Sequence, residues 1–521
     1  MTPYNALDLA TISQNVLQAE YAVRGTVPLR AIEIEEELKT PDGAKKYPFS
    51  RIIYSNIGNP MVMGLKYSMF LRNLIALVTA PHILSKPDTE IRALLNCTQE
   101  CVDRARTFVK ENPSGVGAYT HSQGYMSVRK EVAAFIQQRD GFPSDPSNIY
   151  LSDGASVSVK TVLQLLAGPN PGDGAFLLPI PQYPLYSAAI TLNNAVAVKY
   201  YLLEDDGWSI DLKSLRGAIE THKKTAKSTI RALILVNPGN PSGSVFSRET
   251  LWAAIDICDE YGISIMSDEV YQLNTYAETS GKQRPVFYSM KKVLCEWEKE
   301  KGRKGPALFS FHSVSKGLLG ECGLRGGYLE CYNVPKEITA QIYKCFSVCL
   351  CSNTIGQVVV SYMVNPPKSD EEDKKHLKAV FESMERKAQM LTEGLNKVPY
   401  MSCEVVSGAM YAFPRIYLPK AFVKEAEKEK MAADTLYCLR LLETTGVCGV
   451  PGNGFQQRDN TFHMRITILE DEKFFREFVE KISTFHKDLW KKYGVDSDRA
   501  TCRKEIEERF AAKGKPCPAE W

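Results

Sequence analysis

Near the middle of the chain the sequence reads Ala307-Leu-Phe-Ser-Phe-His-Ser313-Val-Ser-Lys316, and a glycine-rich stretch follows as far as Arg325. The apolar run that opens this stretch predicts a buried strand, so Lys316 should lie just past a strand end. Burial and a neighbouring cation lower the pKa of a lysine, which makes its free amine available as a nucleophile and proton carrier. A solvated surface charge is the ordinary interpretation of a lysine, and the surrounding serines and glycines disfavour it.

A second motif, Asp268-Glu-Val-Tyr271, ends the apolar run at 263–267. A carboxylate that points from a strand end into a cleft suits a protonated pyridine nitrogen, and keeping that nitrogen charged makes the ring an electron sink. Tyr271 could bond a phenolic oxygen on the same ring. Taken alone, this motif is more typical of a helix N-terminus with a capping acid than of a cofactor site.

A third motif places Asn240 in a turn rich in proline and glycine, directly after the apolar run at 232–236. Ordinary turn chemistry explains such a turn alone, but Asn240 could also donate to the phenolic oxygen. Ser313 can bond a phosphate oxygen and Arg325 can clamp the dianion. A covalent lysine, an acid for a ring nitrogen, donors for a phenolic oxygen and a phosphate cup together indicate a pyridoxal 5'-phosphate (PLP) site.

Two further segments fit this chemistry. Ala155 and Ser156 precede a helical pattern and could present backbone N–H groups and a hydroxyl to phosphate. Tyr183 follows an expected strand and could stack on a flat ring, although packing is the ordinary explanation of an aromatic residue beside proline. A Walker A motif does not occur, which argues against a nucleoside triphosphate site.

Short apolar runs alternate with helical patterns between about residues 120 and 360. The expected strands are 175–179, 195–202, 232–236, 263–267, 308–312 and 327–330. Several are apolar almost throughout, as strands buried on both faces are. The alternation predicts an α/β fold whose central, mainly parallel sheet is covered by helices.

The composition changes after residue 367, and we expect four parts. Residues 1–78 form an N-terminal arm and a segment that joins the small domain, and 79–365 form the large, PLP-binding domain. Residues 366–493 form a smaller α+β domain, and 494–521 are a C-terminal extension to which the sequence assigns no role. A short helix is expected over 501–513, ended by Gly514 and Pro516.

The overall composition excludes several classes of protein. The chain has 521 residues and a net charge of +3, which does not indicate nucleic acid or an acidic membrane as a partner. Fourteen cysteines without a C-x-x-C pair suggest reduced thiols in an intracellular protein, and seven scattered histidines predict no metal site. The chain opens without the pattern of a secretory signal, and its apolar runs are too short to span a bilayer. We expect a cytoplasmic protein, with a mitochondrial location left open.

With these residues in place, the chain resembles the fold-type I PLP enzymes and, among them, the alanine aminotransferases of aminotransferase class I/II. The likeness runs from about residue 20 to about residue 492. It rests on stretches such as Asn56-Ile-Gly-Asn-Pro60, Gly117-Ala-Tyr119-Thr-His-Ser-Gln-Gly124, Gly408-Ala-Met-Tyr411 and Phe462-His-Met-Arg465. The resemblance implies the fold-type I architecture of a large and a small domain.

The resemblance also implies a role for each matching position around the cofactor. Lys316 would form the Schiff base and shuttle protons, Asp268 would pair with the pyridinium, and Tyr183 would stack on the ring. The remaining cofactor-binding positions are Tyr271 and Asn240 for the phenolic oxygen, and Ala155, Ser156, Ser313 and Arg325 for the phosphate.

Four positions concern the substrate and the partner subunit. Arg465 matches the arginine that grips the substrate α-carboxylate, with Asn240 beside it, and Gly58 lies where the N-terminal segment closes over that carboxylate. Tyr119 matches the tyrosine that reaches the phosphate of the neighbouring subunit. A homodimer with shared active sites is therefore implied.

The implied reaction is transamination between L-alanine and 2-oxoglutarate, giving pyruvate and L-glutamate by a ping-pong cycle through pyridoxamine phosphate. Glutamate–glyoxylate transamination, or a lyase reaction like that of aminocyclopropane-carboxylate synthase, would use the same residues. One methylene shifts selectivity by only about 1–3 kcal/mol, so pocket size separates these alternatives poorly. A non-enzymatic binding or regulatory module is disfavoured, because Lys316 is present and no basic helix-turn-helix region is evident.

Overall fold

The computed structural model describes residues 8–21, 25–278, 283–514 and 517. Within these residues the largest sheet has eight strands, in the order β2-β9-β8-β7-β6-β3-β4-β5. The strands are β2 (Ile149–Ser152), β3 (Gly174–Ile180), β4 (Val196–Leu203), β5 (Ser209–Ile210), β6 (Thr229–Val236), β7 (Ser264–Asp268), β8 (Leu308–Ser313) and β9 (Gly327–Tyr332). The six predicted strands are present with small shifts at their ends. The sequence analysis missed β2 and β5, which are short and carry no long apolar run.

The direction of the strands brings several of their ends to one edge. Strands β4, β3, β6, β7 and β8 run parallel, and β9 lies antiparallel between β8 and β2. Because β2 and β8 are both antiparallel to β9, they run the same way. The carboxyl ends of β2, β6, β7 and β8 therefore meet the start of β9, and this edge is where open α/β sheets bind ligands. The predicted mainly parallel sheet is confirmed.

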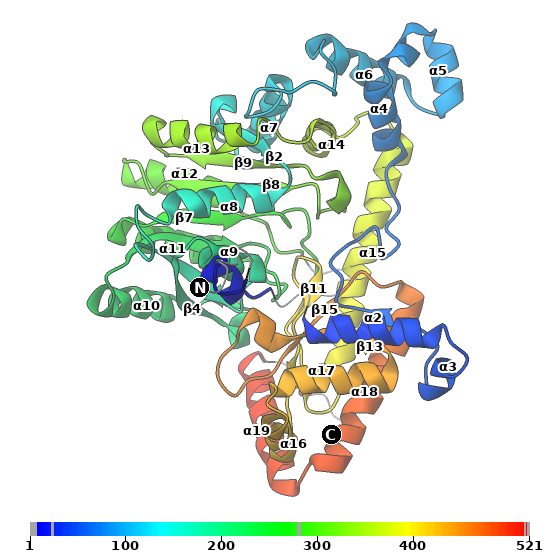
Figure 1. The fold of residues 1–521 in the computed structure, drawn as a ribbon, viewed down its shortest axis with the longest axis vertical. Coiled ribbons are helices and arrows are strands. Elements are labelled where there is room, and N and C mark those ends of the chain that lie inside the picture. The colour runs from blue at the N-terminus through cyan, green and yellow to red at the C-terminus, as the bar shows by residue number, and fades with distance from the viewer. Residues whose placement is uncertain (1–7, 22–24, 279–282, 515–516, 518–521) are drawn as a thin grey trace, which may run out of the picture.

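Helices cover both faces of the sheet (Figure 1). Alternate side chains of the strands pack against the helices on each face. On β3, Phe176 and Leu178 lie in one apolar cluster, while Ala175 and Leu177 lie in another. The first cluster includes α8 (Ala155–Leu166), α9 (Pro184–Leu192) and α13 (Lys336–Val348). The second includes α10 (Leu212–Thr225), α11 (Arg248–Tyr261) and α12 (Met290–Lys301). A third cluster adds α4 (Met69–Thr79), α6 (Gln99–Glu111), α7 (Met126–Asp140) and α14 (Thr354–Val364).

The remaining chain forms a second body that contains short strands. Strand β15 (Met464–Thr467) pairs with β11 (Tyr411–Ala412) and β14 (Val450–Pro451), and β10 (Met401–Ser402) pairs with β12 (Arg415–Ile416). Its helices are α15 (Glu371–Asn396), α16 (Lys420–Lys428), α17 (Ala433–Thr445), α18 (Glu472–Tyr493) and α19 (Asp496–Ala512). The other helices within the described residues are α1 (Gln14–Gln18), α2 (Thr26–Leu38), α3 (Gly43–Lys46), α5 (Asp88–Leu95) and the 3-10 turns η2 (Pro81–Ser85), η3 (Pro146–Asn148), η4 (Glu204–Asp206), η5 (Cys322–Leu324) and η6 (Gly452–Phe455).

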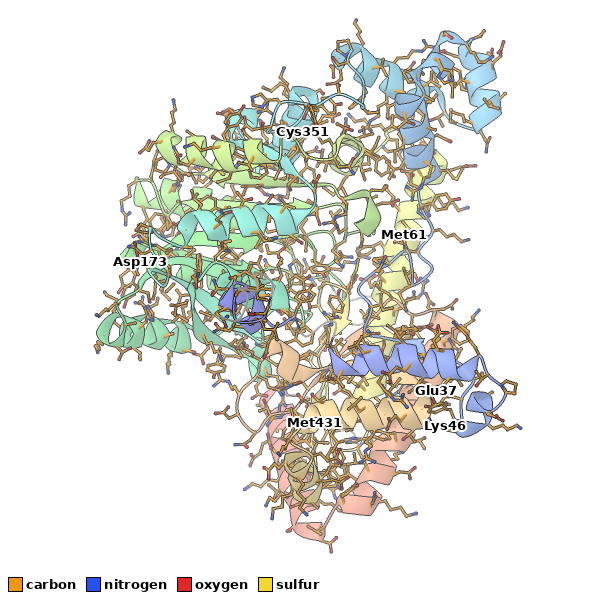
Figure 2. The ribbon with its side chains drawn as sticks, viewed as in Figure 1. Glu37, Lys46, Met61, Asp173, Cys351 and Met431 are labelled. Atoms are coloured by element: carbon orange, nitrogen blue, oxygen red, sulfur yellow. The ribbon has the colours of Figure 1, made fainter. Side chains whose placement is uncertain are left out.

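The N-terminal segment belongs in space with this second body. Strand β1 (Ile53–Tyr54) pairs in parallel with β13 (Val447–Cys448), and α2 packs on α17. The following segment, in which Figure 2 labels Met61, lines a cavity together with residues of α15. We propose on these contacts that the division into 1–78, 79–365, 366–493 and 494–521 describes the domains of the chain.

The C-terminal extension contains a longer helix than predicted. Helix α19 begins at Asp496, several residues before the predicted start at 501, and Gly514 follows it with a positive φ of 62°. Pro516 lies outside the described residues. In the part of the chain that the structure describes, none of the helices has both the length and the apolar character needed to cross a bilayer.

Candidate active site

A cavity of about 360 Å³ lies at the carboxyl edge of the eight-stranded sheet, with walls from both bodies. It is lined by these predicted residues: Gly58, Ala155, Ser156, Tyr183, Asn240, Asp268, Tyr271, Ser313, Lys316, Arg325 and Arg465. Tyr119 is not part of this lining, and its side chain is 78% exposed in the single chain. The structure therefore brings together every predicted site residue except Tyr119.

Lys316 lies just beyond β8, as predicted, and its amine points toward the N-terminal segment. Its Nζ donates a hydrogen bond to the carbonyl oxygen of Gly58 at 2.5 Å. A Cβ at position 58 would lie 2.0 Å from the Oη of Tyr411 and 3.4 Å from that Nζ. Only glycine can therefore occupy position 58 without displacing its neighbours.

Asp268 ends β7 and is 4% exposed. The Tyr186 hydroxyl donates to its Oδ2 at 2.9 Å, and the Val270 N–H donates to its Oδ1 at 3.3 Å. Burial raises the pKa of Asp268 to about 6, although these two donors and the Lys316 charge oppose that rise. A protonated ring nitrogen placed beside this carboxyl would stabilise its charged form.

Arg325 and the start of α8 form a cup of hydrogen-bond donors. Helix α8 begins at Ala155, directly after Gly154, so its first backbone N–H groups lack intrahelical partners. The Arg325 guanidinium lies against this start: its Nη2 would be 2.7 Å from a Cβ at position 154, and it donates to the Asp153 carbonyl oxygen at 2.8 Å. With the Ser313 hydroxyl on the same wall, these groups favour an anion such as phosphate.

Arg465 is a buried cation on β15 and is 2% exposed. It donates from Nη1 to the side-chain oxygen of Asn240 at 3.2 Å and from Nη2 to the carbonyl oxygen of Asn56 at 3.0 Å. Its guanidinium lies 4.2 Å from the ring centroid of Tyr411, and its buried Nε has no hydrogen-bond partner among the residues that the structure describes. Because these partners are neutral, the arrangement suits the carboxylate of a ligand.

Two tyrosines connect the cofactor wall to this arginine. The Tyr271 hydroxyl lies 3.4 Å from that of Tyr411. Burial holds the pKa of Tyr271 well above its usual value. Burial also raises the pKa of Tyr411, but the charges of Lys316 and Arg465 outweigh it, and the pKa of Tyr411 is lowered. Tyr411 is therefore the phenol of this pair that ionises more easily.

The sequence analysis assigned no role to three residues of this site. Tyr411 occurs in a stretch that carried the family resemblance, but neither it nor Tyr186 has a spacing signal, since their partners Tyr271 and Asp268 lie 140 and 82 residues away. Tyr21 also lines the cavity, and its hydroxyl is 3.2 Å from that of Tyr183. Proximity in the fold, rather than sequence, identifies them.

The residues present fit pyridoxal 5'-phosphate. The donor cup can take its phosphate, buried Asp268 can take its protonated ring nitrogen, and the Lys316 amine can take its aldehyde. Gly154 and Gly58 stand where a Cβ would obstruct Arg325 and Tyr411 respectively.

Comparison with known proteins identifies the family. The model of the family "Aminotransferase class I and II" matches residues 94–482. Glutamate–glyoxylate aminotransferase 1 of Arabidopsis thaliana is 39% identical over 94% of this chain and 97% of its own length. A probable mitochondrial alanine aminotransferase of Dictyostelium discoideum is 40% identical over 95% of this chain and 91% of its own.

Solved structures agree on the fold. An alanine aminotransferase from Pyrococcus furiosus superposes with a TM-score of 0.70 at 22% identity, over 92% of this chain and all of that one. This likeness shows the fold-type I architecture, with its mainly parallel central sheet. The chain therefore belongs to the aminotransferase class I and II family and is a PLP-dependent aminotransferase, similar to the alanine aminotransferases.

Proposed function

We propose that this aminotransferase moves an amino group between L-alanine and 2-oxoglutarate. The observation that carries the proposal is buried Arg465, which lies in the cavity of Lys316 and has a neutral hydrogen-bonding set. A substrate α-carboxylate would complete that set. The close contact of Gly58 with Tyr411 and Lys316 supports a donor with a small side chain.

When bound, pyridoxal 5'-phosphate supplies an aldehyde that takes up amino groups and a ring that withdraws electrons from the substrate Cα. We assign its phosphate to Arg325, Ser313 and the first N–H groups of α8, at Ala155 and Ser156. Asp268 would hold the proton of the ring nitrogen.

Three further residues, Tyr183, Tyr271 and Asn240, would contact the ring and its phenolic oxygen. Tyr271 and Asn240 would bond the phenolic oxygen, and Tyr183 would stack on the ring. Arg465 occupies the oxygen end of the Asn240 amide, so its N–H end can serve the phenolic oxygen.

Lys316 would be the catalytic residue. Its Nζ would bind the aldehyde and, once substrate has replaced it, would take the proton that leaves the substrate Cα. The carbonyl of Gly58 holds that amine before substrate arrives. Arg465 would orient the α-carboxylate so that the Cα proton faces Nζ.

We further propose that the active form is a homodimer with shared sites. Tyr119 is 78% exposed and lies outside the cavity of its own chain, which supports a role in the site of a second copy.

Glutamate–glyoxylate transamination is a second candidate, because the Arabidopsis relative that bears this name is 39% identical. Both reactions exchange an amino group between the glutamate/2-oxoglutarate pair and a small amino or oxo acid, and the same residues would perform them. The family assignment favours transamination over the lyase alternative.

A panel of amino donors and oxo acceptors tests the proposal. Purified protein with added PLP is assayed with L-glutamate as donor and either pyruvate or glyoxylate as acceptor, and with L-alanine and 2-oxoglutarate in the reverse direction. We expect pyruvate to give the higher kcat/KM with glutamate, and alanine to be a good donor to 2-oxoglutarate. A clear preference for glyoxylate would replace the first candidate with the second.

Borohydride reduction followed by peptide mapping tests the site itself. The reduced adduct should be found on Lys316, and an adduct on another lysine would contradict the assignment. The compartment stays a prediction: the sequence favours the cytoplasm, while the Dictyostelium relative is named mitochondrial.

A further inference from the structure

Arg509, on helix α19 of the C-terminal extension, bridges the two bodies of the chain. Its side chain is 7% exposed. It forms ion pairs with Glu204 at 3.1 Å and Asp205 at 2.5 Å, both in η4 just after β4 of the large sheet. It also donates to the Tyr417 hydroxyl at 3.0 Å and the Ser402 hydroxyl at 3.2 Å in the second body. One guanidinium thus connects the extension to both bodies.

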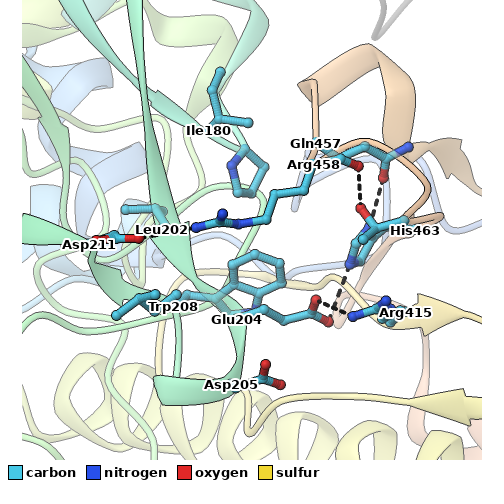
Figure 3. Close-up of a pocket in the computed structure, with 13 residues that line it drawn as sticks. Ile180, Leu202, Glu204, Asp205, Trp208, Asp211, Arg415, Gln457, Arg458 and His463 are labelled. Atoms are coloured by element: carbon cyan, nitrogen blue, oxygen red, sulfur yellow. Dashed lines mark hydrogen bonds and ion pairs between the residues drawn. The ribbon is translucent and has the colours of Figure 1, made fainter. Parts of the chain in front are cut away.

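Glu204 is the acceptor on which these contacts converge. Its Oε1 is 3.1 Å from Arg509 and 3.2 Å from Nε2 of His463, and its Oε2 is 3.7 Å from Arg415. Figure 3 shows His463 and Arg415 reaching Glu204 at the wall of a cavity of about 390 Å³. Burial raises the pKa of Glu204, but the neighbouring cations outweigh it and lower that pKa to about 2. The carboxylate therefore keeps its charge at neutral pH.

The ring of His463 has a defined orientation. Asp434 accepts from the Nε2 of Gln457 at 2.7 Å, which fixes the direction of the Gln457 amide. The Oε1 of that amide then faces the Nδ1 of His463 at 2.7 Å, so Nδ1 must donate to it. The other ring nitrogen is thereby directed at Glu204.

A packed path leads from His463 to Arg465. The His463 ring stacks on Phe413, with centroids 4.7 Å apart and an interplanar angle of 3°. Phe413 packs edge-on against Phe455 at 5.7 Å, and the Arg465 guanidinium lies 4.8 Å from the Phe455 centroid. His463 also precedes Arg465 by two residues and lies directly before β15. A shift of His463 would therefore move the side chain proposed to hold the substrate carboxylate.

We propose that the contact of Arg509 with Glu204, here called the clasp, positions Arg465 for the substrate carboxylate. This inference rests on the proposed role of Arg465. Arg509 and Glu204 are positioning residues, because they act through His463 and its aromatic neighbours and line no part of the Lys316 cavity. The extension then contributes to substrate binding and leaves the chemistry at Lys316 unchanged.

Steady-state kinetics of full-length protein saturated with PLP test the clasp. Arg509→Met and Glu204→Gln should each raise the KM for both L-alanine and 2-oxoglutarate about tenfold and change kcat by less than about twofold, because misplaced binding groups weaken productive binding. Arg509→Lys keeps the charge and should restore part of the affinity. The double variant should be no worse than the poorer single variant, since each change breaks the same Arg509–Glu204 ion pair.

Arg503→Met is the matched control. Arg503 is an exposed arginine on the same helix. Among the described residues, its one ion pair is with Glu507. Its replacement should leave both KM values unchanged. Calorimetry with succinate, which cannot react, measures carboxylate binding apart from turnover and should show the same tenfold weakening for the clasp variants alone.

Arg465→Lys separates this inference from the proposed function. If Arg465→Lys weakens succinate binding but Arg509→Met and Glu204→Gln do not, the clasp is refuted and the role of Arg465 stands. If Arg465→Lys leaves binding unchanged, the role of Arg465 fails. A fall in kcat at constant KM in the clasp variants would also refute the claim that Arg509 and Glu204 position Arg465. If Arg509→Met is poorly folded by circular dichroism, Glu204→Gln, which keeps the shape of the side chain, decides.

Discussion

The cofactor end and the carboxylate end of the cavity are built in different ways. Asp268 and Ser313 end neighbouring strands of one sheet, and Lys316 follows within three residues. At the carboxylate end, Gly58, Tyr411 and Arg465 come from segments of the second body that are far apart in the chain, and two of them contact the large-sheet body, Gly58 through Lys316 and Arg465 through Asn240. The cofactor end should therefore tolerate distant changes, whereas the carboxylate end should respond to anything that shifts one body against the other.

The largest effect expected is at the cofactor end. Lys316→Arg keeps the positive charge but removes the nucleophilic amine, so kcat should fall at least about 10⁴-fold for every substrate pair. Stopped assays over hours measure the residual kcat, and borohydride reduction should yield no adduct at position 316. Lys213→Arg, on α10 away from the site, is the control and should leave kcat unchanged. Activity within tenfold of the parent would rule out Lys316 as the catalytic group.

Asp268→Asn should come next, with a loss in kcat of about 10³-fold, because a neutral amide cannot hold the ring-nitrogen proton as a carboxylate does. KM should change little, since the carboxyl of Asp268 is bonded to Tyr186 and Val270, whereas Arg465 bonds Asn240 and Asn56. Kinetics with alanine and 2-oxoglutarate provide the measurement. If KM rose instead and kcat were kept, the two ends of the cavity would not be independent.

The same substitution has a stability signature without cofactor. The pKa of Asp268 is raised to about 6 from an ordinary 3.8, so between these values the folded chain holds a proton that the unfolded chain releases. Stability contributed by this group therefore falls as pH rises from about 4 to about 6. In urea unfolding of apo-protein, Asp268→Asn should be more stable than the parent by about 2–3 kcal/mol at pH 8 and nearly equal at pH 4. An equal difference at both pH values would contradict the raised pKa.

Gly58→Ala probes the place where the two ends meet. The added Cβ would lie 2.0 Å from the Tyr411 hydroxyl, so either Tyr411 or the N-terminal segment must move. We expect kcat/KM to fall about 10–100-fold through misplacement of these groups, with a lowered Tm. Gly217→Ala in α10, where a Cβ meets nothing within 4 Å, should keep full activity. An active Gly58→Ala enzyme would show that the carboxylate end is more adaptable than this comparison implies.

The smallest effect is expected from Tyr186→Phe. Its hydroxyl hydrogen bond favours the charged form of Asp268, so its loss should raise the pKa of Asp268 further. We expect a roughly threefold loss of kcat/KM near pH 8 that grows as the pH is lowered. Tyr200→Phe removes a comparable buried hydroxyl, bonded to the Ile234 carbonyl, and should leave the pH profile unchanged. If both variants had the same pH profile, the Tyr186 hydroxyl would have no role in setting the pKa of Asp268.

Local motifs account for what could be predicted from sequence. The parallel strands read as apolar runs because they are buried on both faces, and the chemistry-bearing residues follow their ends directly, as Asp268 follows β7. The short strands β2 and β5 carry no such signal. Tyr411 and Tyr186 were missed as functional groups because their partners, Tyr271 and Asp268, lie 140 and 82 residues away.

By itself, the sequence determined the α/β class, the lysine with its acid and phosphate donors, and the likeness to one aminotransferase family, because each depends on residues adjacent in the chain. Only the tertiary structure decided that Gly58 must lack a side chain, that Tyr411 stands between Lys316 and Arg465, and that α19 reaches the large sheet through Arg509. These facts depend on distances between segments that are from about 50 to more than 300 residues apart in the chain. Such distances follow from the packing of two bodies around a common cavity, which no local pattern encodes.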